Sequence, residues 1–131
     1  MSNTDLNADS RTVLVAEDVP SQFLLLAVLL RRHKYNVLHA KNGLEAVHMV
    51  KNHPITVVLM DIEMPIMNGL TAAQEIRKFN PKIPIIALTA SFFSSYEEEA
   101  YACGCNEFIP KPINLRNLIA SISKWSGRIT A

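Results

Sequence analysis

Three acidic side chains come directly after two apolar runs of the chain. The run Val57–Met60 ends at Asp61, and the run Thr12–Ala16 ends at Glu17 and Asp18. Short apolar runs without alternation are typical of strands buried on both faces of a parallel sheet. A single acid after a strand could simply cap the next loop. Two acid-terminated strands in one small chain instead indicate a shared site.

Two further strand ends carry a hydroxyl and an amine. The run 83–88 ends at Thr89, and Lys111 follows a short candidate strand at 107–109. In open α/β sheets, ligands bind beyond the carboxyl ends of the strands, where the strand order reverses. For five strands in the flavodoxin-like order 2-1-3-4-5, that place lies between the first and third strands. The three carboxylates, Thr89 and Lys111 are therefore expected to face one crevice.

The charges of this set predict its chemistry. Three neighbouring carboxylates repel one another unless a divalent cation lies among them, and hard oxygen ligands suit Mg²⁺. The ammonium of Lys111 and the hydroxyl of Thr89 can donate to phosphoryl oxygens. A carboxylate nucleophile in this setting forms an aspartyl phosphate. Asp61, at the end of the central strand, is the best-placed nucleophile.

Strand and helix patterns alternate along the whole chain. Strands are expected at 12–16, 36–40, 57–61, 83–88 and 107–109, and helices at about 21–33, 42–52, 68–79, 94–103 and 114–125. Asn42 with Glu45, and Ser94 with Glu97, have the spacing of capping boxes. Because no pair of strands shows a hairpin signal, the connections are expected to be right-handed crossovers. The predicted fold is a single-domain, doubly wound α/β fold with a five-stranded parallel sheet and five helices.

Composition limits the class of protein. The 131 residues are 49% hydrophobic and carry a net charge of +1, which fits one globular domain and gives no basic stripe for nucleic acid. That domain is expected over 11–125, between a flexible tail or linker at 1–10 and a C-terminal tail at 126–131. The longest apolar run, 23–30, is too short to cross a membrane, and 1–10 has no signal-peptide core. The expected location is the cytoplasm.

The cysteines and histidines show no ligand spacing. Cys103 and Cys105 are separated only by Gly104, so they are expected to be small buried residues and not a disulfide or a metal site. The four histidines are interpreted as surface or helix-end residues: His33, His39, His48 and His53.

The chain resembles the receiver domains of response regulators in two-component phosphorelays over about residues 11–125. The motifs that carry the resemblance are Ala16-Glu17-Asp18, Met60-Asp61-Ile62-Glu63-Met64-Pro65 with Asn68-Gly69, Ala87-Leu88-Thr89-Ala90, and Phe108-Ile109-Pro110-Lys111-Pro112. The wording of 64–69 is most similar to the receivers of hybrid histidine kinases.

The resemblance implies a role for each of these side chains. Asp61 would accept a phosphoryl group from the phosphohistidine of a histidine kinase or histidine phosphotransfer protein. The implied Mg²⁺ ligands are Glu17, Asp18, Asp61 and the backbone carbonyl of Glu63. Thr89 and Lys111 would bind the phosphoryl oxygens, Phe108 would be the switch aromatic, and the Lys111–Pro112 peptide would be cis. Such a domain signals, and catalyses only its own phosphorylation and dephosphorylation.

Two residues depart from the usual family pattern. Glu17 stands where the family often has an aspartate, and its longer carboxylate still suits a metal. Phe108 stands where the family often has tyrosine, so the ring is kept without its hydroxyl. Phe108 could also be an ordinary core aromatic on an edge strand.

The first helix is expected to expose an apolar face. If Arg31 and Arg32 face water, helical spacing places Leu24, Ala27 and Val28 on the same side. Because this helix starts beside the acidic residues, Leu24 and Val28 are predicted to dock the phosphohistidine-bearing helix of the partner.

Two other classes of protein share some of these features. A haloacid-dehalogenase-type phosphatase has an Asp-x-Asp pair that Asp61-Ile62-Glu63 resembles, but that family places the pair after its first strand and adds a cap domain. A flavodoxin-like flavin binder needs a glycine- and hydroxyl-rich loop after the first strand, where this chain has Glu17-Asp18-Val19-Pro20.

Overall fold

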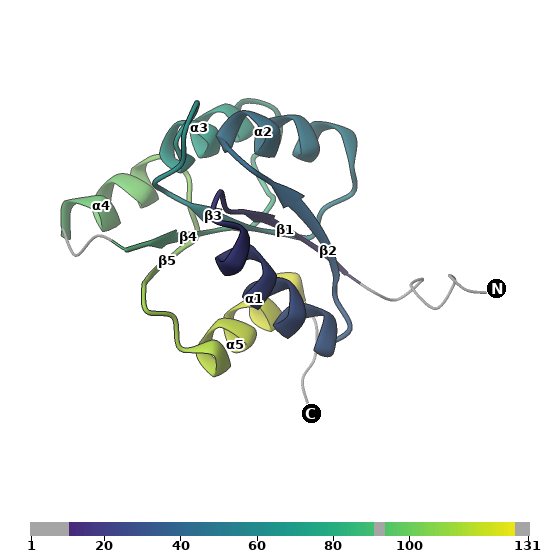
Figure 1. Ribbon diagram of the computed structural model, residues 1–131. Helices are drawn as coiled ribbons and strands as arrows, with labels where there is room; N and C mark the ends of the chain where they lie inside the picture. The colour runs from purple at the N-terminus through teal and green to yellow at the C-terminus, as the bar shows by residue number, and fades with distance from the viewer. Residues whose placement is uncertain (1–10, 91–93, 128–131) are drawn as a thin grey trace.

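Strands and helices alternate along the described residues, 11–90 and 94–127, of the computed structural model (Figure 1). The strands are β1 (Thr12–Ala16), β2 (Asn36–Ala40), β3 (Val57–Asp61), β4 (Ile85–Thr89) and β5 (Glu107–Pro110). The helices are α1 (Pro20–Arg32), α2 (Gly43–Asn52), α3 (Gly69–Phe79), α4 (Ser94–Ala102) and α5 (Leu115–Ser126). Every expected element is present. The fourth strand begins at Ile85 and not at 83, because Pro84 has no N–H to donate to a ladder.

The five strands form one parallel sheet in the order β2-β1-β3-β4-β5, as predicted. At its carboxyl edge, Ala16 pairs with Met60, Asp61 with Leu88, and Thr89 with Pro110. Each of β3 and β4 therefore ends one residue beyond its neighbour on the β1 side, and the residues that follow the three strands meet at one edge.

Alternate strand residues supply two separate hydrophobic cores. On one face, side chains such as Val15, Leu59 and Leu88 pack with α1 and α5. On the other face, side chains such as Met60 and Ala87 pack with α2, α3 and α4. Figure 1 shows the corresponding layers, with α1 and α5 below the sheet and α2 and α3 above it. Burial of both faces explains why the strand sequences are continuously apolar.

Asparagine side chains cap three of the helices. Asn42, Asn68 and Asn114 each accept the backbone N–H three residues later, at 2.8, 2.9 and 3.0 Å. In a capping box, Glu45 would accept the backbone N–H of Asn42. Here Glu45 Oε1 accepts the N–H of the preceding residue, Lys41, instead. The side chain of Ser94 lies outside the described part of the chain, so the second capping box stays a prediction.

Two glycines fix the loop between β3 and α3 through backbone hydrogen bonds. The N–H of Gly43 donates to Met67 O at 2.9 Å, and the N–H of Gly69 donates to Ile62 O at 2.8 Å. A Cβ on Gly69 would lie 2.3 Å from the carbonyl oxygen of Asp61, and one on Gly43 would lie 2.3 Å from that of Met67. The absence of a side chain at both positions lets this loop pack closely beside Asp61.

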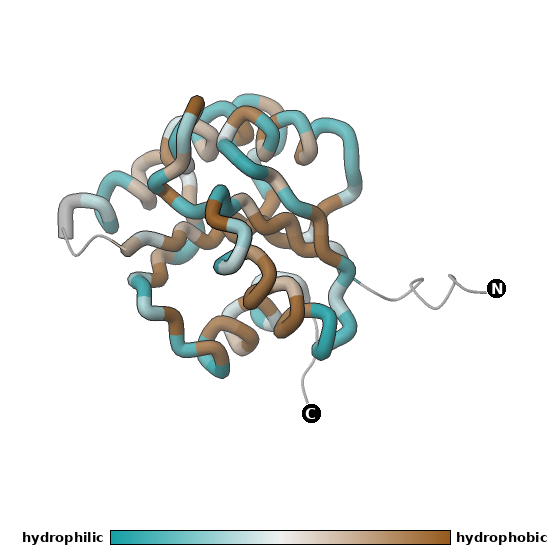
Figure 2. The backbone as a smooth tube through the Cα atoms, viewed as in Figure 1, coloured by the Kyte–Doolittle hydropathy of each residue, from teal (hydrophilic) through white to brown (hydrophobic). Residues whose placement is uncertain are grey.

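The prediction for α1 was wrong at one position. Leu24 and Val28 are 57% and 45% exposed, as expected, but Ala27 is fully buried. Residues 26, 27 and 30 form the inner face of the helix, so 27 cannot share the face of 24 and 28. Leu25, which the sequence interpretation left out, is 57% exposed. Figure 2 shows the hydrophobic residues along the middle of α1 in brown.

Cys105 is buried and Cys103 is half-buried, and both thiols are free. Burial raises the pKa of the Cys105 thiol to about 12, which keeps it protonated and unreactive. His33, His48 and His53 are exposed, as expected. His39 is the exception, since it lies half-buried within β2 and stacks on the ring of Phe23 with 3.6 Å between ring centroids.

Candidate functional site

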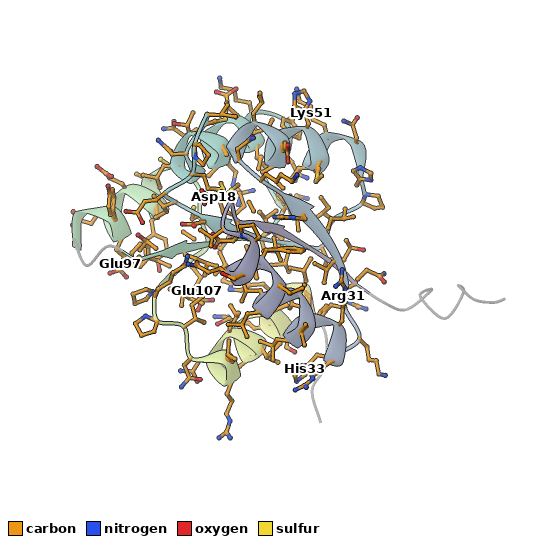
Figure 3. The ribbon with its side chains drawn as sticks, in the orientation of Figure 1. Asp18, Arg31, His33, Lys51, Glu97 and Glu107 are labelled. Atoms are coloured by element: carbon orange, nitrogen blue, oxygen red, sulfur yellow. The ribbon has the colours of Figure 1, made fainter. Side chains whose placement is uncertain are left out.

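Three carboxylates meet at the carboxyl edge of the sheet. Glu17, Asp18 and Asp61 each offer one oxygen, and these oxygens lie within 4.8 Å of one another. Glu17 and Asp61 are buried, at 1% and 4% exposure, whereas Asp18 is exposed. Figure 3 labels Asp18 where β1 leads into α1. The site therefore has a buried floor and one acidic side chain at its solvent edge.

Backbone hydrogen bonds fix the two buried acids. Glu17 is tied to the edge of the sheet by its N–H, which donates to Ala40 O at 3.0 Å, and its Oε2 accepts the N–H of Val19 at 3.2 Å. Asp61 Oδ1 accepts the N–H of Glu63 at 3.1 Å. One oxygen of each carboxylate is therefore held by the loop that follows its strand, and the other faces the crevice.

The amine of Lys111, in the loop after β5, contacts both buried carboxylates. Nζ lies 3.2 Å from Glu17 Oε1 and 3.4 Å from Asp61 Oδ2. The Lys111 N–H donates to Thr89 O at 2.7 Å, which fixes the lysine beside the end of β4. The Lys111–Pro112 peptide is cis, as the family resemblance implied.

Thr89 lies at the buried end of β4, next to the acid cluster. Its Oγ1 donates to Oε1 of Glu63 at 3.3 Å, and the residue is fully buried. Phe108, on the neighbouring strand β5, is half-buried and packs against the core between the sheet and α2, α3 and α4. The structure thus brings Thr89 to the site and places Phe108 in the layer beside it.

The pKa of Asp61 is raised from an ordinary value of 3.8 to about 6. Burial is the main cause and the charge of Glu17 the second, while the Lys111 ammonium and the N–H of Glu63 act in the opposite direction. Burial and like charge both disfavour the ionised form of a carboxyl group. A cation bound among these oxygens would relieve that cost, so the residues fit the predicted Mg²⁺ site.

Two side chains at the site were not found from the sequence. Gln22 Oε1 accepts a hydrogen bond from Lys111 Nζ at 2.7 Å, and Nε2 of His39 lies 2.8 Å from the carbonyl oxygen of Glu17. Gln22 stands in the first turn of the helix that follows Glu17 and Asp18. Its closeness to these acids in the sequence could have indicated that it belongs to the site. His39 carried no such signal, because only strand pairing brings it beside Glu17.

Two pockets flank the acid cluster. One, of about 380 Å³, opens between α1 and the loop after β5, and its lining includes Gln22, Leu25 and Lys111. The other, of about 390 Å³, opens over the loop after β3, and its lining includes Asp18 and Glu63. A cluster of three carboxylates with a lysine ammonium beside it, lying between two openings, suits the transfer of an anionic group.

Comparison with known proteins identifies the family. The sequence pattern of the response regulator receiver domain matches residues 13–123, so the chain belongs to this family. The sensor histidine kinase GacS of Pseudomonas protegens is 31% identical over 93% of this chain. The osmolarity two-component system protein SSK1 of Saccharomyces cerevisiae is 30% identical over 86% of it. This chain spans only 14% and 20% of the lengths of these two relatives.

Solved structures support the same assignment. The receiver domain of a sensor histidine kinase from Pseudomonas aeruginosa, solved with a magnesium ion in its active-site cleft, is 29% identical, with a TM-score of 0.84 over 90% of this chain and 98% of that one. The Ssk1 receiver domain of Saccharomyces cerevisiae, solved with the histidine phosphotransfer protein Ypd1, is 33% identical, with a TM-score of 0.84 over 90% of each chain. The chain is therefore a receiver domain of two-component signalling.

Proposed function

We propose that Asp61 accepts a phosphoryl group from a phosphohistidine of a partner protein. Its carboxylate oxygen attacks phosphorus, the new P–O bond forms as the P–N bond to the imidazole breaks, and the imidazole leaves with the electron pair. The observation that carries this proposal is the position of Asp61 among Glu17, Asp18 and the ammonium of Lys111. Asp61 is the carboxylate at the end of the central strand β3, and Lys111 supplies positive charge beside it.

The proposed metal is Mg²⁺, held by Glu17, Asp18, Asp61 and the backbone carbonyl of Glu63. The support is the donor set, since three carboxylates with oxygens within 4.8 Å are hard ligands that repel one another when no cation is bound. When bound, the ion neutralises charge on the phosphoryl oxygens. The P. aeruginosa receiver domain, which carries magnesium in its active-site cleft, is a related precedent.

Lys111 and Thr89 are proposed to bind the phosphoryl oxygens. The ammonium of Lys111 lies 3.4 Å from Asp61 Oδ2, so it is close enough to donate to an oxygen added there. The hydroxyl of Thr89 now donates to Glu63, and this bond to an exposed carboxylate can be exchanged for a bond to a phosphoryl oxygen. Both side chains then stabilise the negative charge that arrives with the group.

The proposed partner is a histidine kinase or histidine phosphotransfer protein that docks on α1. Leu24, Leu25 and Val28 expose apolar surface on this helix, and Leu25 also lines the pocket that leads to Lys111. An apolar helix face of this kind is suited to pack against a partner helix. Its continuity with the pocket would bring an imidazole on that helix toward Asp61. The Ssk1 receiver, solved with Ypd1, is a relative that binds such a protein.

Phosphorylation is proposed to change the surface around α4, β5 and α5 through Thr89 and Phe108. A shift of the Thr89 hydroxyl toward the phosphoryl group would open space beside the half-buried Phe108, and the ring would move inward. The two arrangements then differ in their affinity for the phosphoryl group, which is what allows the group to bias the equilibrium between them.

The receiver domain was predicted to end at 125, but α5 continues to the buried Ser126 and is capped by Gly127, so the domain is proposed to occupy 11–127 with 1–10 and 128–131 as tails. It is proposed to act in the cytoplasm as a signalling domain that turns over no separate substrate. It is proposed to bind no nucleic acid, in line with its net charge of +1. None of the helices in the described ranges is long and apolar enough to cross a bilayer.

The proposed function is tested by intact mass spectrometry. Incubation with acetyl phosphate and Mg²⁺ should add one phosphoryl mass to the wild type and none to Asp61→Asn, and excess chelator should prevent the addition. An Asp18→Asn variant that still folds provides the comparison for an effect on the metal alone, because it removes one proposed ligand and leaves Asp61 and Lys111 in place. Phosphoryl mass that persists in Asp61→Asn would contradict the assignment of the nucleophile.

A further inference from the structure

The amine of Lys111 makes its shortest contact with a neutral side chain outside the acid cluster. Nζ lies 2.7 Å from Oε1 of Gln22, compared with 3.2 Å from Glu17 and 3.4 Å from Asp61. An ammonium has three N–H donors, so these three acceptors can use all of them. The position of the amine is therefore set by its contacts with two carboxylates and one amide, of which the amide contact is the shortest.

Gln22 is itself held by the first turn of α1. Its N–H donates to Val19 O at 3.1 Å, and the N–H of Val19 donates to Glu17 Oε2 at 3.2 Å. The next residue, Phe23, stacks on His39. The turn that carries Gln22 is thus tied to the buried Glu17 and to the edge of the sheet, and it gives the Gln22 side chain a fixed origin.

The contact between Lys111 and Asp61 is long for an ion pair. Charge-assisted N–H···O bonds are typically about 2.7–2.9 Å, and here the separation is 3.4 Å. Lysine carries its charge on a flexible four-carbon stem, so the stem alone does not keep the amine away from two carboxylates. The short bond to Gln22, at 2.7 Å, is the contact that restrains it.

We infer that Gln22 is a positioning residue for phosphoryl transfer, whose amide oxygen holds the Lys111 amine off Asp61 and leaves Oδ2 open to the incoming phosphorus. This inference rests on the proposed function of Asp61. Without the anchor, the amine closes onto the carboxylates, and Asp61 must break a tighter ion pair before it attacks. The loss of one such hydrogen bond corresponds to a rate about three- to tenfold lower.

The test compares Gln22→Met, which keeps the length of the side chain and removes the acceptor, with the wild type. The labelling rate constant is measured by intact mass with acetyl phosphate and saturating Mg²⁺, so that partner docking plays no part. Gln22→Met should be labelled about three- to tenfold more slowly. The matched control is Gln74→Met, an exposed glutamine on α3, which should be labelled at the wild-type rate.

A double-mutant cycle shows whether Gln22 acts through Lys111. In a Lys111→Ala background, Gln22→Met should cause no further loss, because the amine that it positions is gone. Equal rates for Gln22→Met and the wild type would overturn the inference, and so would the same fold loss in both backgrounds. A wild type that gains no phosphoryl mass would instead contradict the proposed function, and this inference would fall with it.

Discussion

The Nζ of Lys111 lies 3.4 Å from Oδ2 of Asp61, although the two residues are 50 positions apart in the chain. The contact spans two strand ends, because Asp61 closes β3 and Lys111 follows β5, with β4 between them. The register of the parallel sheet brings these ends to one edge. The charged side chains that lie at this edge determine how the protein is expected to respond to pH, Mg²⁺ and phosphorylation.

The raised pKa of Asp61 predicts how stability depends on pH when no metal is bound. Its folded-state pKa is about 6, against an ordinary value of 3.8, so the folded state binds the proton more readily. The ionised group therefore destabilises the fold at pH 7, and this penalty is relieved as pH falls through 6. Asp61→Asn should be more stable than the wild type at pH 7, by about 1–3 kcal/mol.

Urea unfolding of chelator-treated protein at pH 7 and pH 5 measures this difference. The advantage of Asp61→Asn over the wild type should shrink at pH 5, because the wild-type carboxyl is then largely protonated. A difference that stays the same at both pH values would show that the carboxyl group is not perturbed by its surroundings.

Mg²⁺ should stabilise the folded protein through the acid cluster. A ligand that binds only the folded state, at 100 times its Kd, raises the free energy of unfolding by about 2.7 kcal/mol. Thermal unfolding with and without Mg²⁺ measures the effect. Asp18→Asn should reduce it, and Glu98→Gln, an exposed acid on α4, should leave it unchanged. Equal stabilisation of all three proteins would place the ion elsewhere.

The exposed face of α1 predicts a difference between two phosphodonors. The pair of changes Leu24→Gln and Val28→Gln should slow transfer from the phosphohistidine partner by about tenfold or more, because each removes apolar surface that docking would bury. Labelling by acetyl phosphate should be unaffected, since a small donor needs no docking surface.

Leu44→Gln is the matched control for this comparison, because Leu44 is 42% exposed on α2, away from α1. It should leave both rates at the wild-type level. Equal loss with both donors in the α1 variant would mean that the site itself was damaged. Wild-type rates with both donors would mean that the partner binds elsewhere.

The coupling proposed between Thr89 and Phe108 predicts which residues change their environment on phosphorylation. Backbone NMR spectra of the labelled protein should shift along α4 and β5 as well as in the loop after Asp61. Thr89→Ala should keep the shifts near Asp61 and lose those on α4, because the hydroxyl that links the two is absent. Shifts confined to the Asp61 loop in the wild type would rule out this route.

The glycine after the β3 loop predicts a steric effect on the site. Gly69→Ala would place a Cβ 2.3 Å from the carbonyl oxygen of Asp61, so the free energy of unfolding should fall by about 1–3 kcal/mol. Gly127→Ala is the comparison for backbone strain without a clash, since alanine is strained at the φ of 73° found there but a Cβ would meet no atom within 4 Å. Urea unfolding should show the larger loss for Gly69→Ala, together with slower labelling of Asp61. Equal small losses would mean that the loop can move aside.

The sequence by itself predicted the sheet order and most of the site. The apolar runs that end in Glu17-Asp18, Asp61 and Thr89 indicate both the buried strands and the residues of the site. A strand buried on two faces must be apolar until it reaches the edge of the sheet, where polar groups are solvated. The predicted cap at Asn42 was also local, since its side chain bonds to the backbone N–H of Glu45 three residues away. Such short-range patterns can be recognised without any coordinates.

Only the tertiary structure decided the details that depend on side-chain direction across elements. The phase of α1 against the sheet buried Ala27 and exposed Leu25, which a helical period counted from Arg31 and Arg32 did not resolve. The contact of Gln22 with Lys111 joins residues 89 positions apart. Strand register and helix packing fix where the two side chains meet. The local sequence around either residue therefore does not predict the contact.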